Sequence, residues 1–188
     1  MKRIILFLMA ATLLLAACNN NKPKEKVTID PTQMQNAAAE MQKKTEYLQK
    51  LTPVTLDQLK AFLPETLMEA KRSNFNVANT MGAGLATAEY EMNDSTNIKL
   101  SVYDCAGSAG AGIYSLQYLG MYNLQQESDE EYTKTIELNG GKAFEHCQKQ
   151  SNECTLTYFS GDRFLISLEG NNVGADALKQ AAGSLNIK

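Results

Sequence analysis

The four cysteines are the most reactive side chains of this sequence, and the surroundings of Cys18 differ from those of the other three. A cysteine thiolate can accept a covalent group, form a disulfide or attack a substrate. Cys18 follows a basic start, Met1-Lys2-Arg3, and an apolar run from Ile4 to Leu14. That order is typical of a secretory signal peptide, and the run is shorter than the ~20 residues that span a bilayer. We therefore predict that residues 1–17 are a signal peptide.

The four residues Leu15-Ala16-Ala17-Cys18 resemble the lipobox of bacterial lipoproteins at each position. The resemblance implies cleavage after Ala17, a diacylglycerol thioether on Cys18 and an acylated amino terminus. Two or more acyl chains anchor a protein stably, whereas one is marginal. Residues 18–29 are then the lipidated cysteine and a flexible tether, because Asn19 to Lys26 is polar, charged and interrupted by a proline. The alternative is an ordinary cleaved signal with a cysteine nearby.

Asn19, the residue after Cys18, and the net charge limit where the protein is located and which partners it has. Lipoproteins of enteric bacteria with Asp at this position stay in the inner membrane, so Asn19 implies the outer membrane by the same resemblance. We expect the periplasmic face, and surface exposure remains open. The formal net charge is −3, with no basic cluster, which argues against nucleic acid as a partner. The expected partners are the membrane, through the lipid on Cys18, and an envelope protein or small ligand.

Cys147 and Cys154 flank a predicted turn at Gln150-Ser151-Asn152. Export places them in an oxidising compartment, and a directly opposed cross-strand pair lies within disulfide distance. We therefore predict a structural disulfide between them; two free thiols or a redox pair are the alternatives. Cys105 is then left over, because an odd number of cysteines follows Cys18. We expect it to be a buried free thiol, with an intermolecular, mixed or shuffled disulfide as the alternatives.

No pattern in the sequence assembles a catalytic or metal site. His146 adjoins Cys147, but neighbouring residues of a strand point to opposite faces. The cysteines and the one histidine have no recognised zinc-ligand spacing. The segment Gly107 to Gly112 lacks the ending of a phosphate-binding loop and the order of a dinucleotide fingerprint, so we expect it to start a helix that packs closely on a sheet. We predict a non-enzymatic protein without cofactor or metal. The alternative is a thiol-dependent enzyme or redox protein that uses Cys105 or the Cys147/Cys154 pair.

A row of tyrosines is the strongest candidate for binding. Tyr114, Tyr118 and Tyr122 recur every four residues in a predicted helix from Ala109 to Leu124. Tyrosine combines an apolar ring with a polar tip, which suits wet interfaces. The row is either an exposed groove for a ligand or partner, or it is covered by another element such as the first helix.

Residues 30–63 are predicted to form N-terminal helices. Asp30-Pro31 is a good helix start, and apolar or small residues then recur at spacings of three and four as far as about Leu51. This thin face either packs on the domain or joins a partner in a coiled coil; its members are Met34, Ala38, Met41, Thr45 and Leu48. Thr55 and Gln58 form a capping-box pattern for a second, short helix that ends before Pro64.

Residues 64–188 are predicted to form one α+β domain. Period-two patterns separated by turn residues indicate strands at 67–78, 85–92, 98–102, 132–138, 142–149, 154–159 and 163–169. Helical patterns at 109–124 and 173–185 follow the third and the last of these strands. Turns such as Asn139-Gly140-Gly141 suit hairpins. We therefore expect an antiparallel sheet of about seven strands with helices packed on its faces, preceded by the N-terminal helix and the flexible tether.

Three features of residues 63–188 resemble a family of uncharacterised bacterial lipoproteins. They are Leu63-Pro64-Glu65-Thr66-Leu67, the turn Gly161-Asp162-Arg163-Phe164 before an apolar strand, and the closing amphipathic helix. The order of elements is also similar to the Mog1p/PsbP-like fold, an antiparallel sheet flanked by helices. Both resemblances imply a fold, and neither transfers a catalytic residue. From the sequence we expect a lipid-anchored cell-envelope protein, a non-enzymatic module for binding or envelope maintenance.

Overall fold

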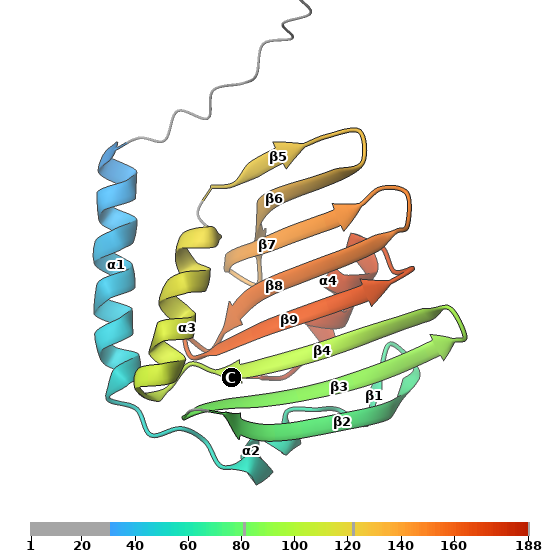
Figure 1. Ribbon diagram of the computed structural model, residues 1–188, viewed down its shortest axis with the longest axis horizontal. Helices are drawn as coiled ribbons and strands as arrows, with labels where there is room; N and C mark the ends of the chain where they lie inside the picture. Colours follow the sequence, from blue (N-terminus) through green and yellow to red (C-terminus); the bar gives the residue numbers. More distant parts are fainter. Residues whose placement is uncertain (1–30, 81, 122, 188) are drawn as a thin grey trace, which may run out of the picture.

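A single antiparallel sheet of nine strands lies at the centre of the protein (Figure 1). The computed structural model describes residues 31–80, 82–121 and 123–187. The strands lie in the order β1-β2-β3-β4-β9-β8-β7-β6-β5, so two meanders meet at the β4–β9 pair. The strands are β1 Thr66–Leu67, β2 Ala70–Thr80, β3 Ala83–Asn93, β4 Thr96–Asp104, β5 Gln125–Glu127, β6 Glu131–Leu138, β7 Gly141–Gln148, β8 Glu153–Ser160 and β9 Phe164–Asn171. The helices are α1 Pro31–Gln49, α2 Leu56–Ala61, α3 Gly107–Gly120 and α4 Ala175–Ser184.

The α+β class and the antiparallel sheet are confirmed, but the expected number of about seven strands is too low. The two additional strands, β1 and β5, are the shortest, and each lies at an edge of the sheet. The strand predicted at 67–78 is split, because Met68 and Glu69 form a tight turn with φ angles of 48° and 69°. Strand β5 pairs with β6 in a segment where the sequence predicts no strand. Strands of two or three residues are too short to show a period-two pattern.

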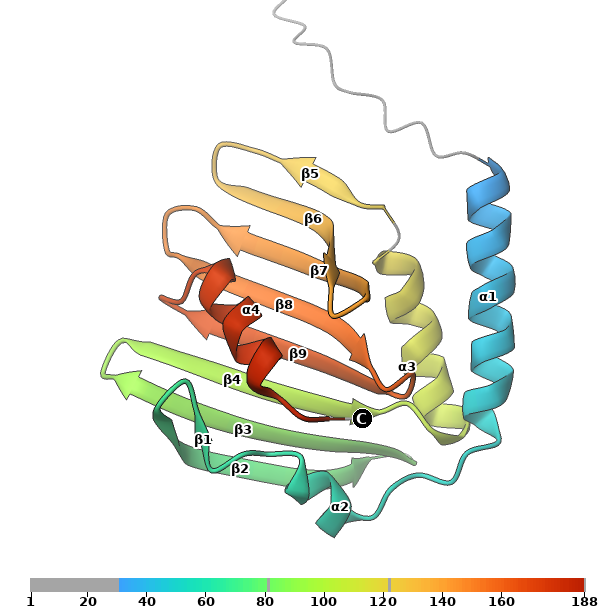
Figure 2. The ribbon, with the colours of Figure 1, turned by 180° about the vertical axis from the view of Figure 1, so that it is seen from behind.

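Helices α1 and α3 lie side by side across one end of the sheet (Figures 1 and 2). Leu48 of α1 is fully buried in a cluster with Ala111 and Tyr114 of α3. The hydroxyl groups of Thr45 and Ser115 hydrogen-bond between the two helices at 2.8 Å. The second half of the predicted α1 face therefore packs on the domain.

The first half of α1 departs from the predicted face. Met34 is 56% exposed, and Ala37 is buried where the spacing predicts Ala38. The predicted cap residue, Asp30, lies outside the described residues.

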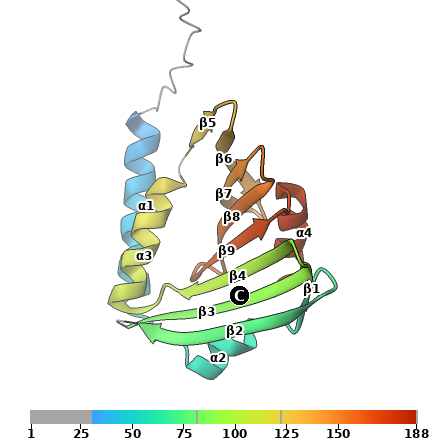
Figure 3. The same cartoon turned by 45° about the vertical axis from the view of Figure 1, so that its right-hand side comes forward.

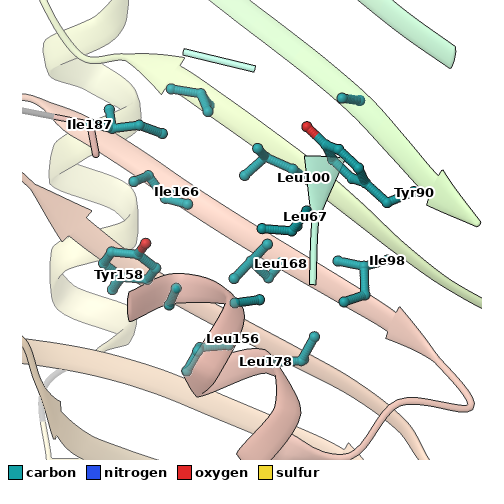
Figure 4. Close-up of a cluster of buried hydrophobic side chains, with 14 of the residues drawn as sticks. Leu67, Tyr90, Ile98, Leu100, Leu156, Tyr158, Ile166, Leu168, Leu178 and Ile187 are labelled. Atoms are coloured by element: carbon teal, nitrogen blue, oxygen red, sulfur yellow. The ribbon is translucent and has the colours of Figure 1, made fainter. Parts of the chain in front are cut away.

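The main core lies between the sheet and α4 (Figures 2 and 4). Alternate strand residues such as Ala88, Leu100 and Leu168 lie opposite each other across β3, β4 and β9, and all three are buried. Leu178 of α4 packs on this cluster. Gly170 allows the close approach of the segment before α4, because a Cβ atom there would lie 2.7 Å from the Cβ of Val173.

Helix α2 and the segment after it cover the β2–β3 part of the same face. The predicted capping box is confirmed, since Thr55 and Gln58 bond reciprocally at the start of α2. Leu59 packs so closely over Gly84 that a Cβ there would lie 2.7 Å from its side chain. The hydroxyl of the buried Tyr90 donates to the carbonyl oxygen of Pro64 at 2.8 Å, which fixes the 63–67 segment under the sheet.

A buried ion pair holds the end of the sheet under α3. Asp104, the last residue of β4, is fully buried and accepts hydrogen bonds from Arg163 Nε at 2.7 Å and Nη2 at 2.9 Å. The backbone N–H groups of Val54 and Ala106 donate to the same carboxylate at 2.8 and 3.1 Å. Burial would raise the pKa of Asp104, but the hydrogen bonds from Arg163, Val54 and Ala106 outweigh it and lower that pKa. The turn at 161–164 thus ties together segments that are distant in sequence.

A second buried carboxylate holds α4 on the far part of the sheet. Glu145 of β7 is 1% exposed and accepts a hydrogen bond from the Tyr132 hydroxyl at 2.9 Å. Lys134 Nζ lies 3.0 Å and Lys179 Nζ of α4 lies 2.9 Å from its two oxygens. Burial would raise the pKa of Glu145, but the bonds from Lys179, Lys134 and Tyr132 lower it. Detachment of α4 would remove Lys179 and leave this buried carboxylate with one cation fewer.

Candidate functional site

The face of the sheet opposite α4 is covered at one end only. There α3 lies over the sheet, and Tyr114 packs on Phe159 with ring centroids 4.7 Å apart. Figure 3 shows α1 and α3 on one side of the sheet and α4 on the other. Over the rest of this face lies no helix of the described residues. We call this uncovered region the open face.

Polar side chains form cross-strand rows on the open face. The rows follow the register across β3, β4, β9 and β8, and the two outer rows continue onto β7 and β6. The row nearest α3 is Thr87, Ser101, Ser167 and Thr157; the next is Glu89, Lys99, Glu169, Thr155, His146 and Thr133; the last is made by Glu91, Asn97, Asn171, Glu153, Gln148 and Glu131. Hydroxyl groups thus adjoin α3, and charges gather at the far ends of the strands.

A hollow of about 380 Å³ lies over the two outer rows. Glutamates at positions 89, 91, 153 and 169 line it, against one lysine at position 99. Lys99 Nζ lies 3.3 Å from Glu169 Oε2, and both side chains are nearly half exposed. The hollow therefore carries a negative balance, with amide groups of Asn97, Asn171 and Gln148 beside the charges.

His146 is the aromatic member of this lining. Its Nδ1 lies 2.9 Å from the Thr133 hydroxyl, and its Nε2 lies 3.8 Å from Glu131. Cys147, the next residue, is buried on the α4 face. The prediction that His146 and Cys147 point to opposite faces is therefore confirmed, and they cannot form a nucleophile–base pair.

The sequence pattern does not single out the residues that line the hollow as a site. Its glutamates and lysine occupy every second position of strands whose other positions are apolar, for example Glu89 beside the buried Ala88 and Tyr90. This alternation marks a solvated face. That β4 and β9 are neighbours depends on the meeting of the two meanders, which no local pattern predicts.

The cysteines occupy two separate places. Cys147 and Cys154 are register partners with Cα atoms 4.1 Å apart, and they form the predicted disulfide. Cys105 is a free thiol and fully buried beside Asp104. Burial raises the pKa of Cys105 to about 12. A thiol of this kind stays protonated at neutral pH and is a poor nucleophile. Cys18 lies outside the described residues.

The tyrosine row does not line a groove in the part of the chain that is described. Tyr114 is 6% exposed, between α1 and the sheet. Tyr118 stacks on Tyr114 with centroids 5.5 Å apart, and its hydroxyl donates to Glu40 of α1 at 3.3 Å. Tyr122 lies outside the described residues. Helix α1 therefore covers Tyr114 and Tyr118, which is one of the two alternatives predicted from the sequence.

The glycine-rich start of α3 packs closely on the end of β4. At Gly110 an added Cβ would lie 2.5 Å from the carbonyl carbon of Cys105. Gly107 has a φ of 76°, which favours glycine, and it turns the chain from β4 into α3. These glycines serve packing and the turn, as the sequence predicts.

The described residues form neither a metal-binding cluster nor a membrane-spanning helix. The described residues hold no group of three or more His, Cys, Asp or Glu side chains that could bind a metal ion. None of the helices in the described ranges is long and apolar enough to cross a membrane.

Comparisons with known proteins were negative. No family model matches the chain, and no match was found among curated proteins or among solved structures. The likeness to lipoproteins and to the Mog1p/PsbP-like layout therefore stays a prediction.

Proposed function

We propose that this chain is a lipid-anchored protein of the cell envelope, a non-enzymatic module that binds its ligand on the open face of the sheet. One observation carries the binding proposal: the two faces of the sheet differ in the polarity of their side chains. The α4 face is packed with apolar side chains, whereas the open face is polar and ends in the hollow lined by Glu89, Glu91, Glu153 and Glu169. A concave polar surface on a rigid sheet is suited to hold a ligand in one orientation.

The anchor proposal rests on Leu15-Ala16-Ala17-Cys18. We place the lipid on Cys18. Asn19 favours the outer membrane, and we expect the domain on its periplasmic face. The domain reaches the membrane through residues 18–29 in this proposal. A test is growth with an alkyne-bearing fatty acid, followed by detection of the labelled chain. We expect label on the wild-type chain and none on Cys18→Ser. An equally labelled Cys18→Ser chain would contradict the anchor.

The chemistry of the hollow favours a cation. Four glutamates face one lysine, and that lysine is already paired with Glu169. An alkylammonium group gains Coulomb attraction from such a surface and finds oxygen acceptors on the glutamates and amides. Such groups occur on polyamines and on the lysine side chains of a basic peptide. We propose an alkylammonium-bearing ligand, and the two sources are separated by experiment.

The binding test uses the full chain and two probes, spermidine and a short oligolysine, followed by calorimetry and by NMR. Spermidine alone binding points to a small molecule, and oligolysine binding more tightly points to a peptide. We expect Glu89→Gln together with Glu91→Gln to weaken binding by roughly three- to ten-fold, and high salt to weaken it further. Glu65→Gln removes an exposed carboxylate away from the hollow and is the matched control. Failure of both probes to bind, or equal binding by the double variant, would refute this site without affecting the anchor.

The thiol-enzyme alternative has less support. Cys147 and Cys154 are joined in a buried disulfide, and Cys105 is fully buried with a raised pKa. Thiol catalysis needs a reachable thiolate.

A further inference from the structure

The outer edge of β2 is largely open. Strand β1 pairs with it only at Ala70 and Lys71 among the described residues. After a bulge between Arg72 and Asn74, the stretch from Asn74 to Thr80 runs in unbroken register with β3. Its outer row of backbone N–H and C=O groups therefore has no partner strand in the described part of the chain, and β2 forms the border of the sheet along this stretch (Figures 1 and 3).

After the bulge, the stretch from Asn74 to Thr80 lacks the usual protection of a sheet edge. Natural sheets shield an edge with charged side chains, proline, bulges or very short strands. From Asn74 to Thr80 there is no charge and no proline. The opposite edge is different, because β5 is a strand of three residues and ends at Glu127. An unprotected edge of this length is a template for another strand.

The two sides of the β2 edge differ in character. Helix α2 lies on the α4 side, where Lys60 Nζ is 4.9 Å from the centroid of the Phe75 ring. Phe75 is nevertheless 44% exposed on that side, and Val77 beside it is half-buried. Asn74 and Asn76 are exposed on the other side.

We propose that the β2 edge pairs with the β2 edge of a second copy of this chain, antiparallel about a two-fold axis at Asn76. From Asn74 to Thr80 the strand itself carries no charge that would meet its own copy, and the nearby cations Lys60 and Arg72 each lie 4.9 Å from the Phe75 ring. This register places Phe75 opposite the second copy's Val77, an aromatic and β-branched pair of the kind that stabilises paired strands. It places Asn76 opposite its own copy and Asn74 opposite Ala78. The same patch thus serves on both copies, as in closed two-fold dimers.

The register is tested by cross-linking. In the full chain, Asn76→Cys brings two thiols together across the axis, within the range for a disulfide. Asn74→Cys is the matched control on the same side of the strand, but its two copies lie four residues apart in register, or roughly 13 Å. We expect a covalent dimer from Asn76→Cys and little from Asn74→Cys under the same mild oxidation. Equal yields from the two variants would refute the register.

The interface is tested by charge. Asn76→Lys places like charges opposite each other, and we expect the dissociation constant of the dimer to rise by roughly five-fold or more in sedimentation. Asn36→Lys makes the same substitution at an exposed position of α1 and is expected to leave it unchanged. Circular dichroism checks that both variants are folded. A wild-type chain that stays monomeric at high concentration, or a dimer insensitive to Asn76→Lys, would overturn the proposal; a monomer that captures a different extended peptide on this edge would do the same.

Discussion

Replacing Asp104 should destabilise the fold more than any single surface change, and its cost follows from the contacts of its carboxylate. The side chain is fully buried and accepts bonds from two nitrogens of Arg163 and from the backbone of Val54 and Ala106. Asp104→Ala leaves the guanidinium, 22% exposed, and two backbone N–H groups without this acceptor. Breaking a buried pair from one side costs about 3–5 kcal/mol. We expect Asp104→Ala to fall in that range and Asp104→Asn, which keeps one oxygen, to cost about 2 kcal/mol.

The measurement is chemical unfolding at pH 7, followed by far-UV circular dichroism. Glu169→Ala is the control, because it also breaks an ion pair, the one between Lys99 and Glu169. Both of those side chains are over 40% exposed, so we expect a loss of about 0–1 kcal/mol. A cost for Asp104→Ala no larger than that of the control would refute the assignment of this ion pair as a structural tie.

The pH dependence provides a second check. The pKa of Asp104 is lowered in the folded state, so its contribution is complete above the unfolded value of about 3.9 and is lost as the pH falls through the folded value. The difference in stability between wild type and Asp104→Asn should therefore shrink below about pH 4. A difference that stays constant as the pH falls would show that the charge of this carboxylate does not stabilise the fold.

Three further predictions concern packing and the thiols. Gly110→Ala should lower the free energy of unfolding by about 1–3 kcal/mol, because its Cβ would lie 2.5 Å from the carbonyl carbon of Cys105. Gly112→Ala has open space around its Cβ and should raise the free energy of unfolding by up to about 1 kcal/mol. Thermal unfolding of the two variants should thus give opposite shifts, and equal shifts would contradict the close approach. Reduction of the Cys147–Cys154 disulfide should lower stability by about 2–3 kcal/mol by chain-entropy reasoning, and an unchanged unfolding midpoint in dithiothreitol would argue against this. Cys105 should not react with a thiol reagent at pH 8 until the protein is unfolded, because burial raises its pKa to about 12. Rapid reaction of Cys105 in the folded protein would support the thiol-enzyme alternative.

The parts of the fold that the sequence predicts well are those with local causes. Asn139, Asn152 and Asp162 take positive φ angles at the predicted turns, and each belongs to a residue type that tolerates this conformation. The capping box at Thr55 is equally local. The split at Met68, by contrast, uses a left-handed conformation in a residue type that seldom adopts it, so no turn signal precedes it. Pairing with neighbouring strands decides the structure there.

The candidate site could be predicted only in part, because its members are joined by topology. Lys99 and Glu169 are far apart in sequence and meet because β9 returns to the centre of the sheet beside β4. The buried contacts of Arg163 and Glu145 were missed for the same reason, since each carboxylate–cation pair joins segments from different parts of the chain. Charged residues in strands signal a solvent-facing position, and Glu145 is an exception that α4 makes tolerable by supplying Lys179.

One end of the open face adjoins α1 and α3, and the other end holds the hollow. Helices α1 and α3 cover the face at the end of β4 that contains Tyr103, whereas the hollow lies at the other end, near Asn97. The described chain begins in α1, on the covered end (Figure 1). An anchor attached ahead of α1 therefore joins the domain at the end away from the hollow. Pairing through β2 would also leave both hollows free, because β2 forms the sheet border while the hollow is lined from β3, β4, β7, β8 and β9. The start of α1, the proposed dimer edge and the proposed binding face thus lie on separate parts of the fold, so each proposal can fail without the others.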